Sequence, residues 1–180
     1  MQTLITRLNA PLIAFMTALM LAACNPDNTP QQQLGEDRIA VGISTEGEVR
    51  IIYGQPSMVW EEDNGARTLE FVKGPAGHRT FMIGIGSDGK VKSIDQVLKP
   101  SVFMKVVQGM SVDQVRRLIG KPGKVVPYAL SKTEGHFYRY LEGTESRYFV
   151  VQYDANPNSA NKGLVDKTMM VMDEEAGGNR

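Results

Sequence analysis

The feature that most constrains the fold is an internal repeat with a constant offset of 66 residues. Residues 45–56 read TEGEVRIIYGQP and residues 111–122 read SVDQVRRLIGKP, with Val, Arg, Gly and Pro at matching places. Repetition at a fixed period indicates a single supersecondary unit that occurs more than once. The chain is therefore expected to fold as two tandem copies of one module.

Each copy predicts a short helix. Thr45 with Glu48, and Ser111 with Gln114, have the spacing of a capping box, in which the hydroxyl and the third helical side chain each satisfy a backbone N–H. A glycine then favours a left-handed C′ residue, and a proline two positions later prevents continuation. Helices this short are unstable alone and must pack on other structure. Their apolar stripes have i, i+3, i+4 spacing and comprise Val49, Ile52, Tyr53 and Val115, Leu118, Ile119.

Strand-like segments follow each helix. Alternating apolar residues predict strands over 67–72, 79–85 and 90–98 in the first copy, and over 136–141, 147–153 and 164–172 in the second. Ser87-Asp88-Gly89 is expected to turn a hairpin, and residues 154–161 form a longer loop at the corresponding place. The predicted fold class is α+β, with two tandem modules, each a short helical section packed on a three-stranded antiparallel meander.

The N-terminal segment Leu21-Ala22-Ala23-Cys24 resembles a bacterial lipobox, and Cys24 is the only cysteine in 180 residues. Arg7 gives a positive start and residues 12–21 form an apolar stretch with small residues at the cut, as in a lipoprotein signal peptide. A stretch of ten residues is too short to span a bilayer. The alternative is an ordinary secretory signal with a nearby cysteine. We expect Cys24 to carry acyl chains that insert into membrane lipid.

These features predict the organisation of the whole chain. Removal of Arg7 changes the formal net charge from 0 to −1, so there is no basic surplus of the kind that nucleic-acid binding requires. In lipoproteins that this segment resembles, a residue other than Asp after the cysteine favours the outer membrane, and here that residue is Asn25. The boundaries are 1–23 for the signal peptide, 24–34 for a flexible tether, 35–99 and 100–173 for the modules, and 174–180 for a frayed tail.

The second copy carries a family resemblance. Residues 102–122 are similar to the SmpA/OmlA (BamE-like) family of outer-membrane lipoproteins. The resemblance rests on Gly109-Met110-Ser111, Gln114, Val115, Leu118, Ile119, Gly120 and Pro122. The resemblance implies an accessory role beside the β-barrel assembly machinery, at the periplasmic face of the outer membrane. The tandem arrangement looks more like the secreted β-lactamase inhibitor proteins, which implies the alternative of a periplasmic binding or inhibitor module for an enzyme such as a hydrolase.

No motif predicts an enzyme, a metal site or a cofactor. Residues 84–89 fit G-x-G-x-x-G, but a strand rather than a helix follows, so a hairpin is favoured over a nucleotide site. His78 is expected in a solvated turn and His136 at a partly exposed strand start, and neither has the spacing of a metal ligand. A catalytic role would require Glu61, His78 and a serine or threonine in one pocket.

The candidate partner-binding residues are Trp60, Tyr138, Tyr140 and Tyr148. If Phe137 faces the helices, the tyrosines line the open face of the sheet, where a large ring with a polar tip suits an interface. If the faces are inverted, the tyrosines belong to the core. The sequence pattern leaves both arrangements open, and it leaves Trp60 as either a core residue or an interface anchor.

Overall fold

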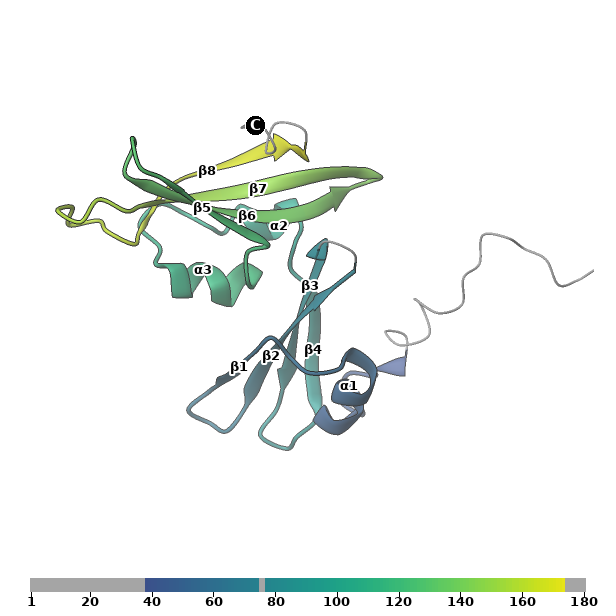
Figure 1. The fold of residues 1–180 in the computed structure, drawn as a ribbon. Helices are drawn as coiled ribbons and strands as arrows, with labels where there is room; N and C mark the ends of the chain where they lie inside the picture. Colours follow the sequence, from purple (N-terminus) through teal and green to yellow (C-terminus); the bar gives the residue numbers. More distant parts are fainter. Residues whose placement is uncertain (1–37, 75–76, 174–180) are drawn as a thin grey trace, which may run out of the picture. The chain divides into compact units, whose positions relative to one another are not determined.

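The computed structural model describes residues 38–74 and 77–173, all of which belong to the compact unit Gly35–Arg180. These residues form two four-stranded antiparallel sheets, each preceded by a short helix (Figure 1). The predicted signal peptide, the tether with Cys24 and Asn25, and the predicted tail lie outside the described residues.

The first module has strand order β1-β2-β3-β4, with each strand hydrogen-bonded to the next. Its elements are α1 (Glu46–Tyr53), β1 (Met58–Glu61), β2 (Arg67–Lys73), β3 (Arg79–Ile85) and β4 (Val91–Gln96). The second module repeats this order with β5-β6-β7-β8. Its elements are α2 (Pro100–Phe103), α3 (Val112–Ile119), β5 (Lys124–Tyr128), β6 (Thr133–Glu142), β7 (Glu145–Asp154) and β8 (Val165–Met172).

The predicted capping boxes are confirmed in both copies, and each helix ends at its predicted glycine. Each capping box forms completely: the Glu48 carboxylate accepts from the Thr45 N–H at 2.7 Å, and the Gln114 side chain accepts from the Ser111 N–H at 2.8 Å. Gly54 and Gly120 both have a φ of 81°, but their ψ values of −153° and −165° place them outside the left-handed helical region that the sequence predicted. Only glycine readily adopts this backbone conformation.

The structure corrects the predicted three-stranded meander and the α+β class. The fold is mostly β, because β1 and β5 add a fourth strand to each sheet. Both are short edge strands without a clear alternation of buried and exposed residues, and β5 contains Pro127, which cannot donate to a ladder. Periodicity was therefore too weak to predict them, although all six predicted strands are present.

Each module has its own core on the face of the sheet that its helix covers. In the first, Val49 and Tyr53 of α1 pack with Leu69, Phe71 and Ile83. In the second, α2 and α3 pack on one side of the sheet (Figure 1), where the Phe103 ring stacks on Phe149 at 4.3 Å. The Phe103 ring also meets Tyr140 edge-on at 4.9 Å. We call the helix-covered face of each sheet its inner face and the opposite face its outer face.

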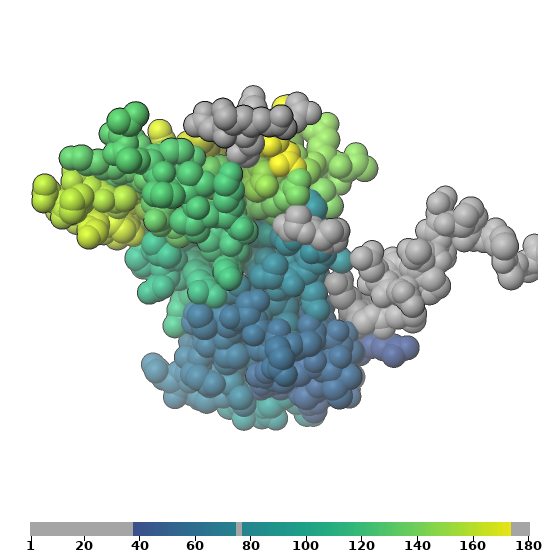
Figure 2. Space-filling view, viewed as in Figure 1, coloured from purple at the N-terminus to yellow at the C-terminus, as the bar shows by residue number. Residues whose placement is uncertain are grey.

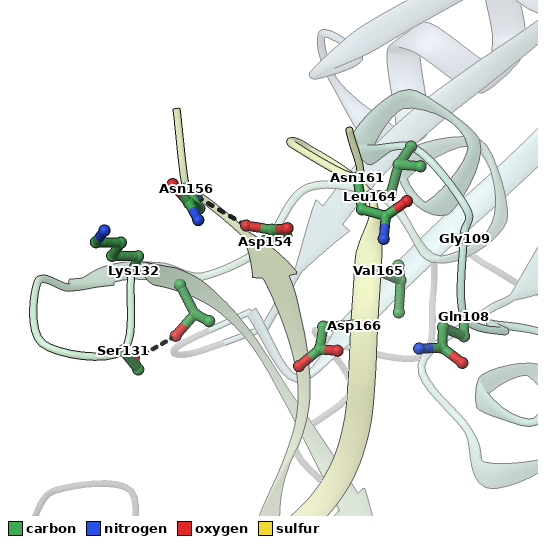
Figure 3. Close-up of a pocket in the computed structure, with 11 residues that line it drawn as sticks. Gln108, Gly109, Ser131, Lys132, Asp154, Asn156, Asn161, Leu164, Val165 and Asp166 are labelled. Atoms are coloured by element: carbon green, nitrogen blue, oxygen red, sulfur yellow. Dashed lines mark hydrogen bonds between the residues drawn. The ribbon is translucent and has the colours of Figure 1, made fainter. Parts of the chain in front are cut away.

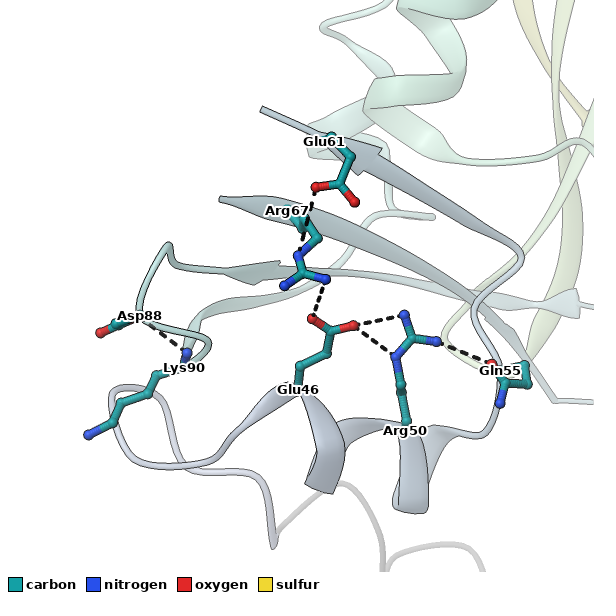
Figure 4. A network of polar contacts seen from close by, with 7 residues as sticks. All are labelled: Glu46, Arg50, Gln55, Glu61, Arg67, Asp88 and Lys90. Atoms are coloured by element: carbon teal, nitrogen blue, oxygen red, sulfur yellow. Dashed lines mark hydrogen bonds and ion pairs between the residues drawn. The ribbon is translucent and has the colours of Figure 1, made fainter. Parts of the chain in front are cut away.

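A polar network ties α1 to the first sheet (Figure 4). The Glu46 carboxylate of α1 accepts from Arg50 at 2.7 Å and from Arg67 of β2 at 3.2 Å. The Arg67 guanidinium also lies 3.8 Å from Glu61 of β1. Ion pairs near the protein surface contribute about 0–1 kcal/mol each, so we take this partly buried network mainly to position the helix.

The outer face of the first sheet contacts the end of α3. The Glu70 carboxylate of β2 is 0% exposed, and it accepts from the backbone N–H of Lys121 at 3.0 Å and from Nε of Arg116 at 3.4 Å. A Cβ atom at Gly120 would lie 2.6 Å from Cγ2 of Thr80, which shows how closely the backbone approaches the sheet. We call these contacts of Glu70, Thr80, Arg116, Gly120 and Lys121 the α3 junction.

Candidate functional site

The register identifies one row of side chains across the outer face of the first sheet. Met58 in β1 stands opposite Glu70, Glu70 opposite Met82 in β3, and Met82 opposite Asp95 in β4. Directly opposed residues of an antiparallel pair project from the same face. This row is largely covered, because Glu70 and Met82 are buried in the α3 junction or beside it, while Asp95 at the edge is exposed.

The corresponding row of the second sheet is Lys124, Phe137, Val150 and Met169. Met58 and Lys124 are each the first residue of the strand that follows the repeated helix, so the two rows are equivalent. In this row Phe137 replaces Glu70 and Met169 replaces Asp95. The outer face of the second sheet is therefore apolar at places where the first sheet carries carboxylates.

The outer face of the second sheet is an aromatic and aliphatic surface. Tyr148 stands beside this row and meets the Phe137 ring edge-on at 5.9 Å. The Tyr128 ring lies over Gly135, where a Cβ atom would come within 3.0 Å of it. Tyr128, Leu141 and Met169 are at least 36% exposed. By register and contact, the surface comprises Tyr128, Phe137, Leu141, Tyr148, Val150, Met169 and Val171, and we call it the second outer face.

Cationic side chains surround the second outer face. Lys124 Nζ lies 5.4 Å from the centroid of the Phe137 ring, and the Arg139 guanidinium lies 5.7 Å from that of Tyr148. Arg139 also contacts the Asp173 carboxylate, and this contact lowers the pKa of Asp173 and raises that of Arg139. Within residues 38–74 and 77–173, Lys124 and Lys167 have no ion pair. The rim is thus positively charged and partly unneutralised.

The structure places the predicted tyrosines on different faces. Tyr138 and Tyr140 are 1% and 0% exposed in the second core, so the arrangement with inverted faces is the one observed, and the open-face interpretation of these two residues is corrected. Tyr148 lies on the outer face. Trp60, opposite Thr68 in β1 and β2, is half-buried on the outer face of the first sheet. Sequence reasoning did not place Phe137, Val150 and Met169 on the outer face, because strand alternation alone does not tell which face the helices cover. On that face Phe137 and Val150 are each only 5% exposed, whereas Met169 is 36% exposed.

Burial controls the chemistry of the core tyrosines. It is the main cause that raises the pKa of Tyr138, and the nearby Tyr153 ring and Glu70 carboxylate add to the effect. Burial likewise raises the pKa of Tyr140 and of Tyr153. All three hydroxyls therefore remain protonated at neutral pH and act as packing groups with a polar tip.

Neither histidine belongs to the second outer face as defined above, although His78 is close enough to Asp173 to help lower the pKa of that carboxyl. His136 is only 6% exposed, which corrects the predicted partial exposure: it points to the inner side of the sheet, where its ring packs on Tyr153 at 4.6 Å. Its Nε2 lies 2.8 Å from the Glu134 carboxylate. His78, expected in a solvated turn, is half-buried. In the described part of the chain, no group of His, Cys, Asp and Glu residues is arranged to hold a metal ion.

A pocket of about 450 Å³ lies at one end of the second sheet (Figure 3). It is lined where β6 starts and β7 ends, beside the β7–β8 loop, which forms the yellow-green projection at the left of Figure 2. Asp154 accepts from the backbone N–H of Asn156 at 2.8 Å, and Ser131 and Thr133 hydroxyls lie 2.8 Å apart. Hydrogen bonds from Ser159 and Asn156 lower the pKa of Asp154. These polar groups order the loop, and neither Glu61 nor His78 lines the pocket.

Comparison with known proteins gives two similar structures and no family. No protein-family profile and no curated protein sequence matches the chain, so the SmpA/OmlA resemblance has no support from these searches. The chain is similar to a DUF4309 family protein (YjgB) from Bacillus subtilis, at 11% identity and a TM-score of 0.27, covering 75% of this chain and 82% of that one. It is also similar to a candidate β-lactamase inhibitor protein from Streptococcus mutans, at 13% identity and a TM-score of 0.28, covering 71% and 82%.

Among the residues that the structure describes, no helix is long and apolar enough to cross a membrane.

Proposed function

We propose that this chain is a non-enzymatic binding protein whose docking surface is the second outer face. One observation carries the proposal. The equivalent face of the first sheet is occupied by the α3 junction, whereas α2 and α3 pack on the inner face of the second sheet (Figure 1). In the described part of the chain, no helix covers the second outer face, although it is the more apolar of the two.

The composition of the face indicates what kind of partner fits. Tyrosine and methionine offer large apolar area, and methionine adapts its shape to the surface it meets. The surrounding Lys124 and Lys167 have no carboxylate partner among the described residues. A protein surface with an apolar centre and acidic side chains at its edge is complementary to this arrangement. We take such a periplasmic protein, for example an enzyme such as a hydrolase, as the partner.

Anchoring through Cys24 is part of the proposal and rests on the lipobox-like residues 21–24. Each buried CH₂ of an acyl chain contributes about 0.8 kcal/mol to membrane binding, so two or three chains hold a protein durably. Attachment at the periplasmic face of the outer membrane raises the local concentration of the module near its partner. A weak contact at the second outer face is then sufficient for function.

A role beside the β-barrel assembly machinery is the second candidate. Its support is the similarity of residues 102–122 to the SmpA/OmlA family, together with the complete capping box at Ser111. In that case the acidic partner is an assembly subunit.

Crosslinking in cells tests the proposal. A photo-crosslinking amino acid at position 148 should capture a protein, whereas the same amino acid at Ile51, which is 84% exposed on α1, should not. Mass spectrometry then assigns the captured protein to a periplasmic enzyme or to the assembly machinery. Equal capture from both positions, or none from position 148, would contradict the proposed docking face.

Two variants separate the docking face from the anchor. Met169→Asp introduces the residue type that Asp95 supplies in the first sheet, and it should abolish the crosslink from position 148 without loss of folded protein. Cys24→Ala should release the protein from the membrane fraction while the purified chain still binds the captured partner. Retention of Cys24→Ala in the membrane fraction would show that the anchor proposal is wrong.

A further inference from the structure

The two sheets have four edge strands, and three of them carry features that limit pairing with another strand. An exposed edge presents unpaired N–H and C=O groups, which proteins protect by short length, charge or proline. β1 has only four residues, β5 contains Pro127, and β4 carries the exposed Lys92 and Asp95.

β8 also carries two exposed charges, Asp166 and Lys167, but both lie near its start. It has eight residues, and its second half, from Thr168 to Met172, contains neither proline nor a charged side chain. Met169, Met170 and Met172 are 36%, 46% and 52% exposed. The start of the strand is already paired, because the N–H and C=O of Val165 bond to Met110 and Gly109. The segment from Thr168 to Met172 has the length and the apolar side chains that strand pairing between chains requires.

We infer that β8 pairs in antiparallel fashion with β8 of a second copy of this chain, on a two-fold axis at Met170. In this register Met170 stands opposite Met170 of the second copy, and Met169 opposite its Val171. Lys167, which has no ion pair within the described residues, then stands opposite Asp173 of the second copy. The two-fold axis creates this charge pair twice.

Face excludes the registers one residue away, and charge disfavours the register in which Lys167 stands opposite Val171. Met169 and its partner Val150 lie on the outer face. Lys167 and its partner Gln152 are each two residues away along the same strands, so the Lys167 side chain lies on the outer face as well. Asp173 reaches the outer face as well, since it contacts Arg139. A slip of one residue would join the outer face of one copy to the inner face of the other. A slip of two residues in the direction that places Lys167 opposite Val171 would keep the faces together but lose the charge pair.

The paired chains would form one continuous eight-stranded sheet with two second outer faces side by side. This arrangement doubles the docking area and makes it bivalent toward a repeated partner. The strand pairing itself does not depend on the proposed function, because it concerns the edge of the sheet and not its face; only the doubled docking area rests on that function.

Sedimentation and disulfide formation test the pairing. The purified full chain should show twice its monomer mass, and Met170→Pro should return it to the monomer, with circular dichroism showing that an edge proline leaves the fold intact. Met170→Cys should give a disulfide-linked dimer on oxidation, because opposed residues have Cα atoms within disulfide reach. Met104→Cys, at a site that is 79% exposed, is the matched control and should not. A monomeric mass at all concentrations would overturn the inference.

A charge-swap experiment tests the register itself. Lys167→Glu and Asp173→Lys should each be monomeric alone, because each places like charges opposite each other at both ends of the pair. Mixed in equal amounts, the two variants should form a heterodimer. Position 167 of the first variant, now Glu, then stands opposite position 173 of the second, now Lys, and Asp173 of the first stands opposite Lys167 of the second. If both variants dimerise alone, or if the mixture stays monomeric while the unaltered chain dimerises, this register is wrong.

Discussion

The outer faces of the two sheets are equivalent in register and opposite in chemistry. In the first, Glu70 is fully buried and bound by Arg116 and the Lys121 N–H. In the second, Phe137 stands at the same place within an aromatic and aliphatic surface. The comparison teaches that equivalent faces of two repeated sheets can differ in what they contact: the first binds a neighbouring part of its own chain, and we propose that the second binds a partner.

The largest expected effect separates the inner and outer faces of the second sheet. Tyr140→Ala should lower the free energy of unfolding by about 3–5 kcal/mol, because it removes a fully buried ring that packs against Phe103. Tyr148→Ala should cost about 1 kcal/mol, since that ring is only half-buried. Equilibrium urea unfolding measures both. Equal losses would show that the assigned faces are wrong.

Two matched glycines isolate the α3 junction. Gly54 and Gly120 have the same φ of 81°, but an added Cβ has nothing within 4 Å at Gly54 and lies 2.6 Å from Thr80 at Gly120. Gly54→Ala should therefore cost only the backbone strain, about 1–3 kcal/mol. Gly120→Ala should cost about 1–3 kcal/mol more, because of overpacking. Thermal unfolding of the two variants compares them directly. If the two costs agree, the close approach at Gly120 is not real.

The buried carboxylate gives a smaller effect. Glu70→Ala leaves the Lys121 N–H and the Arg116 guanidinium without their acceptor, and it should cost about 2 kcal/mol, since Arg116 remains partly hydrated. Asp95→Ala, at the exposed edge of the same row, should change stability by less than about 0.5 kcal/mol. The urea unfolding midpoints of the Glu70→Ala and Asp95→Ala variants measure these two changes in stability. A neutral Glu70→Ala would indicate that the first outer face is open to water.

The smallest effect concerns the β3–β4 and β7–β8 connections. Lys92 and the Lys90 N–H lower the pKa of Asp88, and Ser159 and the Asn156 N–H lower that of Asp154. A carboxyl whose pKa is lowered in the folded state stabilises the fold above its unfolded pKa of about 3.9, and this contribution disappears as pH falls through the lower folded value. NMR titration of both carboxyls, with Asp88→Asn and Asp154→Asn as controls, measures the two shifts. A folded pKa at or above the unfolded value would contradict these hydrogen bonds.

Local signals in the sequence predicted much of each module. Three kinds of feature depend only on residues within one element or one turn, and the sequence predicted all of them. They are the capping boxes at Thr45 and Ser111, the glycines that end both helices, and the six longer strands. Edge strands β1 and β5 were missed because four or five residues, one of them proline in β5, carry no readable period.

The candidate site depends on contacts that no local pattern contains. Residues 136–141 carry aromatic side chains on both faces, so alternation could not tell whether Phe137 or Tyr138 turns outward. Glu70 reads as an ordinary polar strand residue, and its burial arises from contacts with residues 46 and 51 positions later in the chain. The equivalence of Glu70 with Phe137 becomes visible only when the strand registers are compared.

The central claim is that the second outer face is open in the isolated chain and covered by a partner in cells. Hydroxyl-radical footprinting of Tyr148 tests it most directly, with the buried Tyr140 and the exposed Met104 as internal references. The account predicts that Tyr148 is oxidised in the purified protein and protected in intact cells, while Met104 reacts in both and Tyr140 in neither. Equal oxidation of Tyr148 in the purified protein and in cells would contradict it.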